Sequence, residues 1–143
     1  GGHENIVVYT NSIAMITELS RFPEIDIYVL GGQYNRQMLF LEGSLTQSVV
    51  ETTSYKKVFV SVDAIQSDGR CYVSNYDTAR LIQVILRHAR QKVLLSDHTK
   101  LQADPNVCCC NLEEFDHWVT TQGTDARTLK LLKAKTEIHV VKV

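Results

Sequence analysis

The stretch DTARLIQVILRHARQKVLLSD, residues 77–97, joins a helical pattern directly to a strand pattern. Its second part, KVLLSD, is a short apolar run that stops abruptly at Asp97, which indicates a buried strand. Its first part predicts a helix over residues 78–90, because apolar residues recur there at helical spacing. The predicted apolar face consists of Ala79, Ile82, Ile85, Leu86 and Ala89.

The same alternation of strand and helix extends to both ends of the chain. Further strands are predicted at residues 6–10, 25–30, 57–62, 115–121 and 136–143. Further helices are predicted at residues 13–22, 44–54 and 124–135, the last capped by Thr124 or Asp125. This order predicts a single domain over residues 1–143, with an α/β fold in which helices flank a mainly parallel sheet.

Composition narrows the class of protein. The 143 residues are 44% apolar and 22% charged, with a net charge of −1, which is typical of one folded domain. The balance of 15 basic and 16 acidic residues argues against direct nucleic-acid binding by this chain. No apolar run approaches the roughly 20 residues that span a bilayer. We expect a cytoplasmic fragment of a longer protein, since the chain begins at Gly1-Gly2 without a methionine.

The cysteines and histidines predict no metal site. Three of the four cysteines are consecutive, at 108–110, and neighbours on a strand point to opposite faces, so we expect reduced, buried thiols. His98 lies between Asp97 and Lys100, whereas the helix and strand patterns around His88, His117 and His139 predict structural roles. No known catalytic motif is present, and no catalytic residue is predicted.

Polar or glycine residues follow four of the predicted strands. In open α/β sheets, ligands bind beyond the carboxyl ends of the strands, so these residues are candidate ligand contacts. They are Thr10, Asn11 and Ser12, then Gly31 and Gly32, then Asp63, and finally Asp97 with Lys100.

These candidates suit a sugar phosphate. Carboxylates accept hydrogen bonds from neighbouring hydroxyls, while a lysine and helix amides hold an anion. Other roles remain open for each residue: Asn11 or Ser12 could cap a helix, the two glycines could form a turn, and Asp63 or Asp97 could bond loop amides. Lys100 could be solvated or paired with Asp97.

Several motifs in order resemble the effector domain of the DeoR family of bacterial sugar-metabolism repressors. They are VVYTNSIAMITELSRFPEIDIYVLGG, LEGSLTQSVVE, KVFVSVDAIQSDG and VLLSDHTKL, and the resemblance covers about residues 6–142. It implies a sensor of a phosphorylated sugar, without cofactor, whose fold is similar to ribose-5-phosphate isomerase. The site residues that it implies are Thr10, Asn11, Ser12, Gly31, Gly32, Asp63, Gly69, Asp97 and Lys100.

The resemblance also implies partners outside this chain. Operator DNA would bind through an N-terminal winged helix-turn-helix that is absent here, and the protein would be a homodimer or homotetramer. A preceding strand with an Asp-x-Gly-Thr-Thr phosphate loop is absent too. Thr99 and Ala64 stand where the family usually has Ser and Gly.

Two other functions remain alternatives. A sugar-phosphate isomerase would need a catalytic base, yet the stretch GRCYVSNYDTARLI between the two Asp motifs contains no Glu and no glycine run. We therefore predict that the chain is not an enzyme. A pure oligomerisation module is the other alternative, with the cysteine strand and the last strand IHVVKV at exposed sheet edges.

Overall fold

The computed structural model describes residues 5–101 and 103–142. The chain divides into two compact units, Gly1–Thr52 (unit 1) and Thr53–Val143 (unit 2), and each is described by itself.

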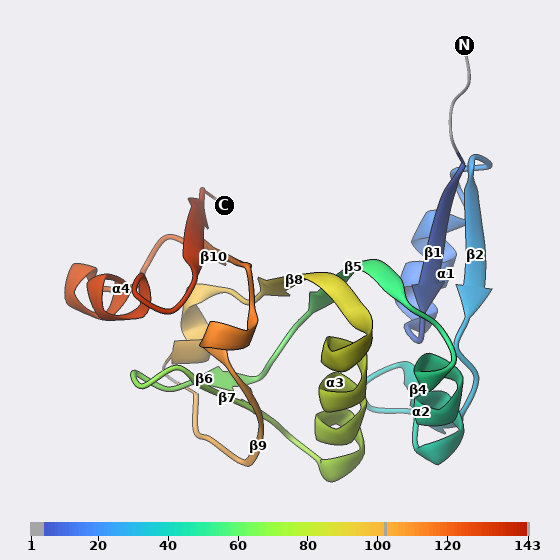
Figure 1. The fold of residues 1–143 in the computed structure, drawn as a ribbon, viewed down its shortest axis with the longest axis horizontal. Helices are drawn as coiled ribbons and strands as arrows, with labels where there is room; N and C mark the ends of the chain where they lie inside the picture. The colour runs from blue at the N-terminus through green and yellow to red at the C-terminus, as the bar shows by residue number, and fades with distance from the viewer. Residues whose placement is uncertain (1–4, 102, 143) are drawn as a thin grey trace. The chain divides into compact units, whose positions relative to one another are not determined.

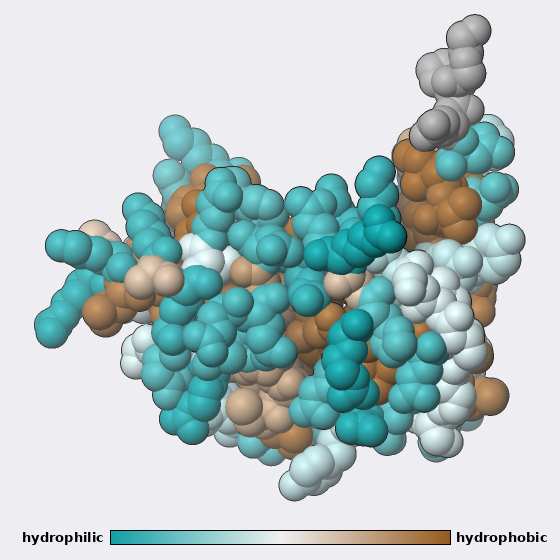
Figure 2. All heavy atoms as spheres, in the orientation of Figure 1, coloured by the Kyte–Doolittle hydropathy of each residue, from teal (hydrophilic) through white to brown (hydrophobic). Residues whose placement is uncertain are grey.

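Unit 1 begins with a β-α-β element (Figure 1). β1 (Ile6–Thr10) and β2 (Ile25–Val29) pair in parallel, joined by helix α1 (Ile13–Leu19). The parallel register sets Thr10 opposite Val29, so both strands end at the same edge. Figure 2 shows apolar side chains exposed over β1, and Ile6 and Val7 are 58% and 49% exposed.

The rest of unit 1 is a hairpin followed by a helix. β3 (Gln33–Asn35) and β4 (Phe40–Glu42) pair antiparallel, and α2 (Ser44–Glu51) follows directly. The sequence reading missed this hairpin, because each strand is only three residues long and the pattern shows no alternation over so short a run.

Unit 2 is built on a four-stranded parallel sheet in the order β11-β10-β8-β5 (Figure 1). The strands are β5 (Tyr55–Val60), β8 (Ala89–Leu95), β10 (His117–Thr121) and β11 (Glu137–Val141). Leu94 and Trp118 are fully buried at the centre of this sheet, and Trp118 Nε1 donates to the Ser96 carbonyl at 3.1 Å. The predicted α/β fold with a mainly parallel sheet is confirmed. Similarity to ribose-5-phosphate isomerase stays a prediction.

Helices and a second sheet complete unit 2. The helices are α3 (Tyr76–His88) and α4 (Ala126–Leu132), with 3-10 turns η1 (His98–Leu101) and η2 (Leu112–Glu114). The second sheet is antiparallel, in the order β6 (Ala64–Ile65), β7 (Arg70–Val73) and β9 (Val107–Asn111). The sequence reading took SDGR only as a turn, and it is the turn between β6 and β7.

Three local predictions were wrong, and one of them is the burial of all four cysteines, because Cys108 is exposed. Ala89 belongs to β8 and not to the apolar face of the helix, because α3 ends at His88 and the chain extends at once. The sulfur atoms of Cys109 and Cys110 lie 3.6 Å apart rather than on opposite faces. The strand pairing of β7 with β9 shifts register between Cys71 and Tyr72, and this irregularity breaks the simple alternation.

The cysteine strand and the last strand of the chain lie at sheet edges, as the sequence predicted. β9 and β11 each lie at the end of their sheet order. Within the described residues, no helix has the length and apolar character needed to cross a membrane.

Candidate ligand-binding site

The ends of β5 and β8 in unit 2 are held in register beyond their last backbone pair. Val60 pairs with Leu94, and two residues later the Ser96 hydroxyl accepts from the Val62 N–H at 3.2 Å. The same hydroxyl lies 3.4 Å from the Val62 carbonyl, to which it donates. Asp63 and Asp97 each come next in the chain, so the two residues follow neighbouring strands at equivalent chain positions.

Asp97 caps the short helix η1. Its Oδ1 accepts from the Thr99 N–H at 2.9 Å and from the Thr99 hydroxyl. These two hydrogen bonds, with the nearby charge of Lys100, hold the pKa of Asp97 below its ordinary value of 3.8. Asp97 is exposed, and both of these hydrogen bonds go to the same carboxylate oxygen. Asp97 therefore accepts hydrogen bonds from its own loop, which is one of the alternatives stated above. Its contact with a ligand stays a prediction.

Among the described residues, the charged groups of Asp63 and Lys100 form no close contact with an opposite charge. The backbone of each is fixed: the Asp63 N–H donates to the Tyr72 carbonyl at 2.9 Å, and the Lys100 N–H donates to the Asp97 carbonyl at 3.2 Å. Both side chains are half-buried. Within the part of the chain that the structure describes, neither charged group forms a hydrogen bond or an ion pair. Lys100 is thus not the ion-pair partner of Asp97.

A small cavity opens beside η1, and the sequence reading missed most of its wall. Its volume is about 220 Å³, and it is lined by Ser67, His98, Leu101, Gly123, Thr124, Asp125 and Thr128. The hydroxyl of Thr124 is buried and has no hydrogen-bond partner among the described residues. The segment after β10 carries most of these groups. The rule that selected the residues after the other strands could have found it.

His98 is fixed in the cavity wall by two neighbours. The ring Nδ1 of His98 lies 2.8 Å from the Thr121 hydroxyl, and the backbone N–H of His98 donates to the same oxygen at 3.1 Å. Gly123 packs directly on the imidazole, since a Cβ there would lie 2.6 Å from Cδ2 of the ring. The glycine also has a φ of +130°, which a side chain would strain.

The predicted residues of unit 1 gather at the ends of β1 and β2. The Thr10 carbonyl accepts from the Leu30 N–H at 2.8 Å, and the Thr10 hydroxyl accepts from the Ser12 N–H at 3.1 Å. Ser12 caps α1, because its hydroxyl accepts from the Met15 N–H at 3.2 Å. The helix-cap alternative therefore holds for Ser12.

Asn11 ties the end of β1 to the neighbouring hairpin. Its side-chain nitrogen donates to the Leu41 carbonyl at 2.9 Å, and its backbone carbonyl accepts from the Leu41 N–H at 2.8 Å. Asn11 thus has a structural task whether or not it contacts a ligand.

The glycine pair after β2 has two different environments. A Cβ on Gly32 would lie 2.0 Å from the hydroxyl oxygen of Thr46 and 2.6 Å from the Glu42 carbonyl, so only glycine fits. A Cβ on Gly31 would meet no described atom within 4 Å, although its carbonyl accepts from the Thr46 hydroxyl at 2.6 Å. Packing therefore explains Gly32 and leaves Gly31 open to a ligand role.

Gly69 is not brought to η1. It forms the turn between β6 and β7 with a φ of +91°, and its neighbours are Asn111 and Lys135. Its carbonyl accepts from the Leu112 N–H at 2.7 Å. The structure gives this glycine a turn role, and a ligand contact remains only a prediction.

Comparison with known proteins finds a matching sensor-domain family and several similar transcriptional regulators. Residues 1–122 match the family model of the DeoR C-terminal sensor domain. The chain is 26% identical to the HTH-type transcriptional repressor CsqR of Escherichia coli over 141 residues, which cover 99% of this chain and 52% of the relative. It is 28% identical to the HTH-type transcriptional regulator GlpR of Haloferax volcanii over 121 residues, which cover 85% of this chain and 47% of the relative.

A third relative has a name that refers to lactose. The lactose phosphotransferase system repressor of Staphylococcus epidermidis is 24% identical over 138 residues, which cover 95% of this chain and 54% of that protein. The chain spans about half the length of these relatives. The matched family is a sensor domain and the relatives are regulators rather than enzymes, so the prediction that the chain is not an enzyme is confirmed. The chain belongs to the family of DeoR C-terminal sensor domains.

Proposed function

We propose that this sensor domain binds a phosphorylated sugar, or a similar phosphorylated intermediate, at the carboxyl edge of the unit 2 sheet. The observation that carries the proposal is the pair of charged groups at that edge, the Asp63 carboxylate and the Lys100 ammonium, which form no hydrogen bond or ion pair among the described residues. A lysine without a protein partner is a natural contact for a phosphate, and a carboxylate accepts two hydrogen bonds from adjacent hydroxyls.

The cavity beside η1 supports the same ligand class. Lys100 lies between two residues of η1, His98 and Leu101, whose side chains line the cavity. The buried hydroxyl of Thr124 lacks a partner among the described residues, and a buried polar group gains free energy when a ligand supplies its hydrogen bond. A polyhydroxylated ligand could supply that bond.

In unit 1, Thr10, Asn11, Ser12, Gly31 and Gly32 are proposed ligand contacts on the strength of the family resemblance. Of these, Gly31 has the clearest independent support, because a Cβ there would meet no described atom within 4 Å and no packing contact requires a glycine. Gly69 belongs to the same proposed set, with the turn as its structural role.

For the longer protein, we propose that ligand binding alters its affinity for operator DNA. The three relatives are named as transcriptional repressors or regulators, and about half of each lies outside the match to this chain. DNA binding would belong to a separate domain. A homodimer or homotetramer could form through the edge strands β9 and β11, since unpaired strand edges invite pairing between copies.

Calorimetric titration with a panel of pentose and hexose phosphates, each beside its free sugar, tests the proposal. At least one phosphorylated sugar should bind. Lys100→Met should weaken that ligand at least tenfold while changing free-sugar binding little, because the methionine keeps the stem and removes only the charge. Lys56→Met is the matched control, since Lys56 is an exposed lysine near the amino end of β5. Equal effects of the two substitutions would remove Lys100 from the site.

A further inference from the structure

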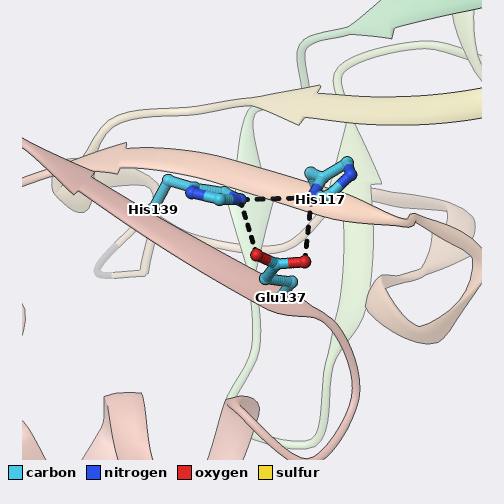
Figure 3. A group of neighbouring side chains, drawn as sticks. All are labelled: His117, Glu137 and His139. Atoms are coloured by element: carbon cyan, nitrogen blue, oxygen red, sulfur yellow. Dashed lines mark hydrogen bonds and ion pairs between the residues drawn. The ribbon is translucent and has the colours of Figure 1, made fainter.

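Two histidines and a glutamate converge on the opposite end of the unit 2 sheet from η1. His117 and Glu137 are the first residues of β10 and β11, and the parallel register sets them opposite each other. His139 follows Glu137 by two residues and therefore projects from the same face of β11. Figure 3 shows the three side chains turned toward one another from these two strands.

The distances among the nitrogen and oxygen atoms are short. Nδ1 of His117 lies 3.1 Å from Nε2 of His139. Oε2 of Glu137 lies 3.4 Å from His117 Nδ1, and Oε1 of Glu137 lies 3.5 Å from His139 Nε2. One ligand atom from each of the three residues thus lies within 4.8 Å of the other two. The sequence patterns had predicted structural roles for both histidines.

These separations fit a metal ion. Zinc binds nitrogen and oxygen ligands at about 2.0–2.1 Å, and a tetrahedron of that size separates its ligand atoms by about 3.3 Å. The two histidine nitrogens lie 3.1 Å apart, close to that value, and each lies 3.4 or 3.5 Å from a different oxygen of Glu137. A rotation of the carboxylate would bring one oxygen toward both nitrogens. Two imidazoles and a carboxylate are also a donor set that zinc and related divalent transition metals prefer.

We propose that His117, Glu137 and His139 bind one divalent transition-metal ion of the zinc class. With three protein ligands, the fourth coordination position is left for water or an exogenous ligand. A groove of about 470 Å³ adjoins the site and is lined by Lys57, Gln91, Val93, His117, Val119, His139 and Val141. The ion would link the edge strand β11 to β10 through side chains, in addition to the backbone ladder.

The proposal does not depend on the sugar-phosphate site. His117 lies within the matched residues 1–122, whereas Glu137 and His139 lie beyond them, so the family model does not cover the complete set. Without an ion, the same side chains would form a hydrogen bond between the imidazoles and ion pairs to Glu137. Metal titration separates the two cases.

The experiment uses the whole chain with His3→Ala and Cys108→Ser as its background. These changes remove the histidine outside the described residues and the exposed thiol. Calorimetry with Zn²⁺, in a buffer free of phosphate and imidazole, should show one ion per chain, and the thermal midpoint should rise on binding. His117→Ala and His139→Ala should each weaken Zn²⁺ at least tenfold, as should Glu137→Gln, which preserves shape.

A matched control and a second probe make the result decisive. His88→Gln at the end of α3 should leave Zn²⁺ affinity unchanged, and circular dichroism should show every variant folded. Co²⁺ should give the visible bands of a nitrogen and oxygen site without thiolate charge transfer. Absence of Zn²⁺ binding, unchanged affinity in both His117→Ala and His139→Ala, or a thiolate spectrum would overturn the proposal.

Discussion

The Ser96 hydroxyl lies within hydrogen-bond distance of both the N–H and the carbonyl of Val62, at 3.2 and 3.4 Å. Both residues are buried, and backbone pairing of β5 with β8 ends before them, at Val60 and Leu94. A hydroxyl can accept and donate at once, so the Ser96 side chain supplies both hydrogen bonds that a neighbouring strand's backbone would otherwise give to Val62. It thereby fixes where Asp63 and Asp97 leave the sheet.

Replacing Ser96 by alanine should destabilise unit 2 by about 1–3 kcal/mol, because the buried Val62 N–H loses its partner. Urea unfolding measures the change. Ser67→Ala is the control, since this serine is exposed and its loss should cost about 0.5 kcal/mol or less. Similar losses for the two serines would show that the Ser96 hydroxyl does not hold the strand ends.

The adjacent glycines of unit 1 should respond differently to the same substitution. Gly32→Ala would force a Cβ against Thr46 and the Glu42 backbone, and an overpacked site of this kind costs about 1–3 kcal/mol. Gly31→Ala would meet open space and should change the free energy of unfolding little, while weakening ligand binding if the proposed contact exists. Thermal unfolding of both variants checks the contrast, and equal destabilisation would contradict it.

Asp97 should titrate below its ordinary pKa of 3.8, chiefly because the Thr99 side chain and backbone stabilise the carboxylate. Since folding lowers this pKa, the stabilisation is present above the unfolded value and is lost as the pH falls through the folded value. Thr99→Val removes the hydroxyl and keeps the N–H, so it should shift the pKa of Asp97 upward. Carboxyl NMR titration measures both values. An unchanged pKa in the variant would mean that the hydroxyl does not act on Asp97.

The cysteines should differ sharply in reactivity. Cys108 is exposed, whereas Cys71, Cys109 and Cys110 are buried. The hydrogen bond between the Cys109 and Cys110 thiols, together with burial, raises the pKa of Cys109. For Cys110, the same bond lowers the pKa, but the neighbouring Cys71 and burial outweigh it, and the net pKa is raised.

Iodoacetamide at mildly alkaline pH should therefore modify Cys108 first, because it is exposed while the other three thiols are buried. The raised pKa values of Cys109 and Cys110 also keep these two thiols from forming the reactive thiolate. Peptide mass spectrometry identifies the modified residue. In denaturant all four cysteines should react. Rapid labelling of Cys109 in the folded protein would contradict the burial of this pair.

The long periodic segments could be predicted from the sequence because each pattern reports one buried face. The helix around Ala79 and the strand that ends before Asp97 are of this kind. The antiparallel sheet of unit 2 could not be predicted, because β6 has two residues and β9 is a run of cysteines whose register is broken opposite β7.

The candidate site was only partly predictable for a similar reason. Asp63 and Asp97 follow long strands, and the rule for carboxyl ends applies to them directly. Thr124 and Gly123 obey the same rule after β10, but their role depends on how His98 packs. The contact between His117 and His139 depends on the pairing of β10 with β11, which spacing along the chain does not reveal.

The most direct test of the proposed ligand site is an amide NMR titration of the ¹⁵N-labelled chain with the phosphorylated sugar that binds in calorimetry. The account predicts saturable shifts concentrated at residues 97–101 and 121–125, with loss of those shifts in Lys100→Met. Shifts confined to other segments, or identical shifts in Lys100→Met, would contradict it.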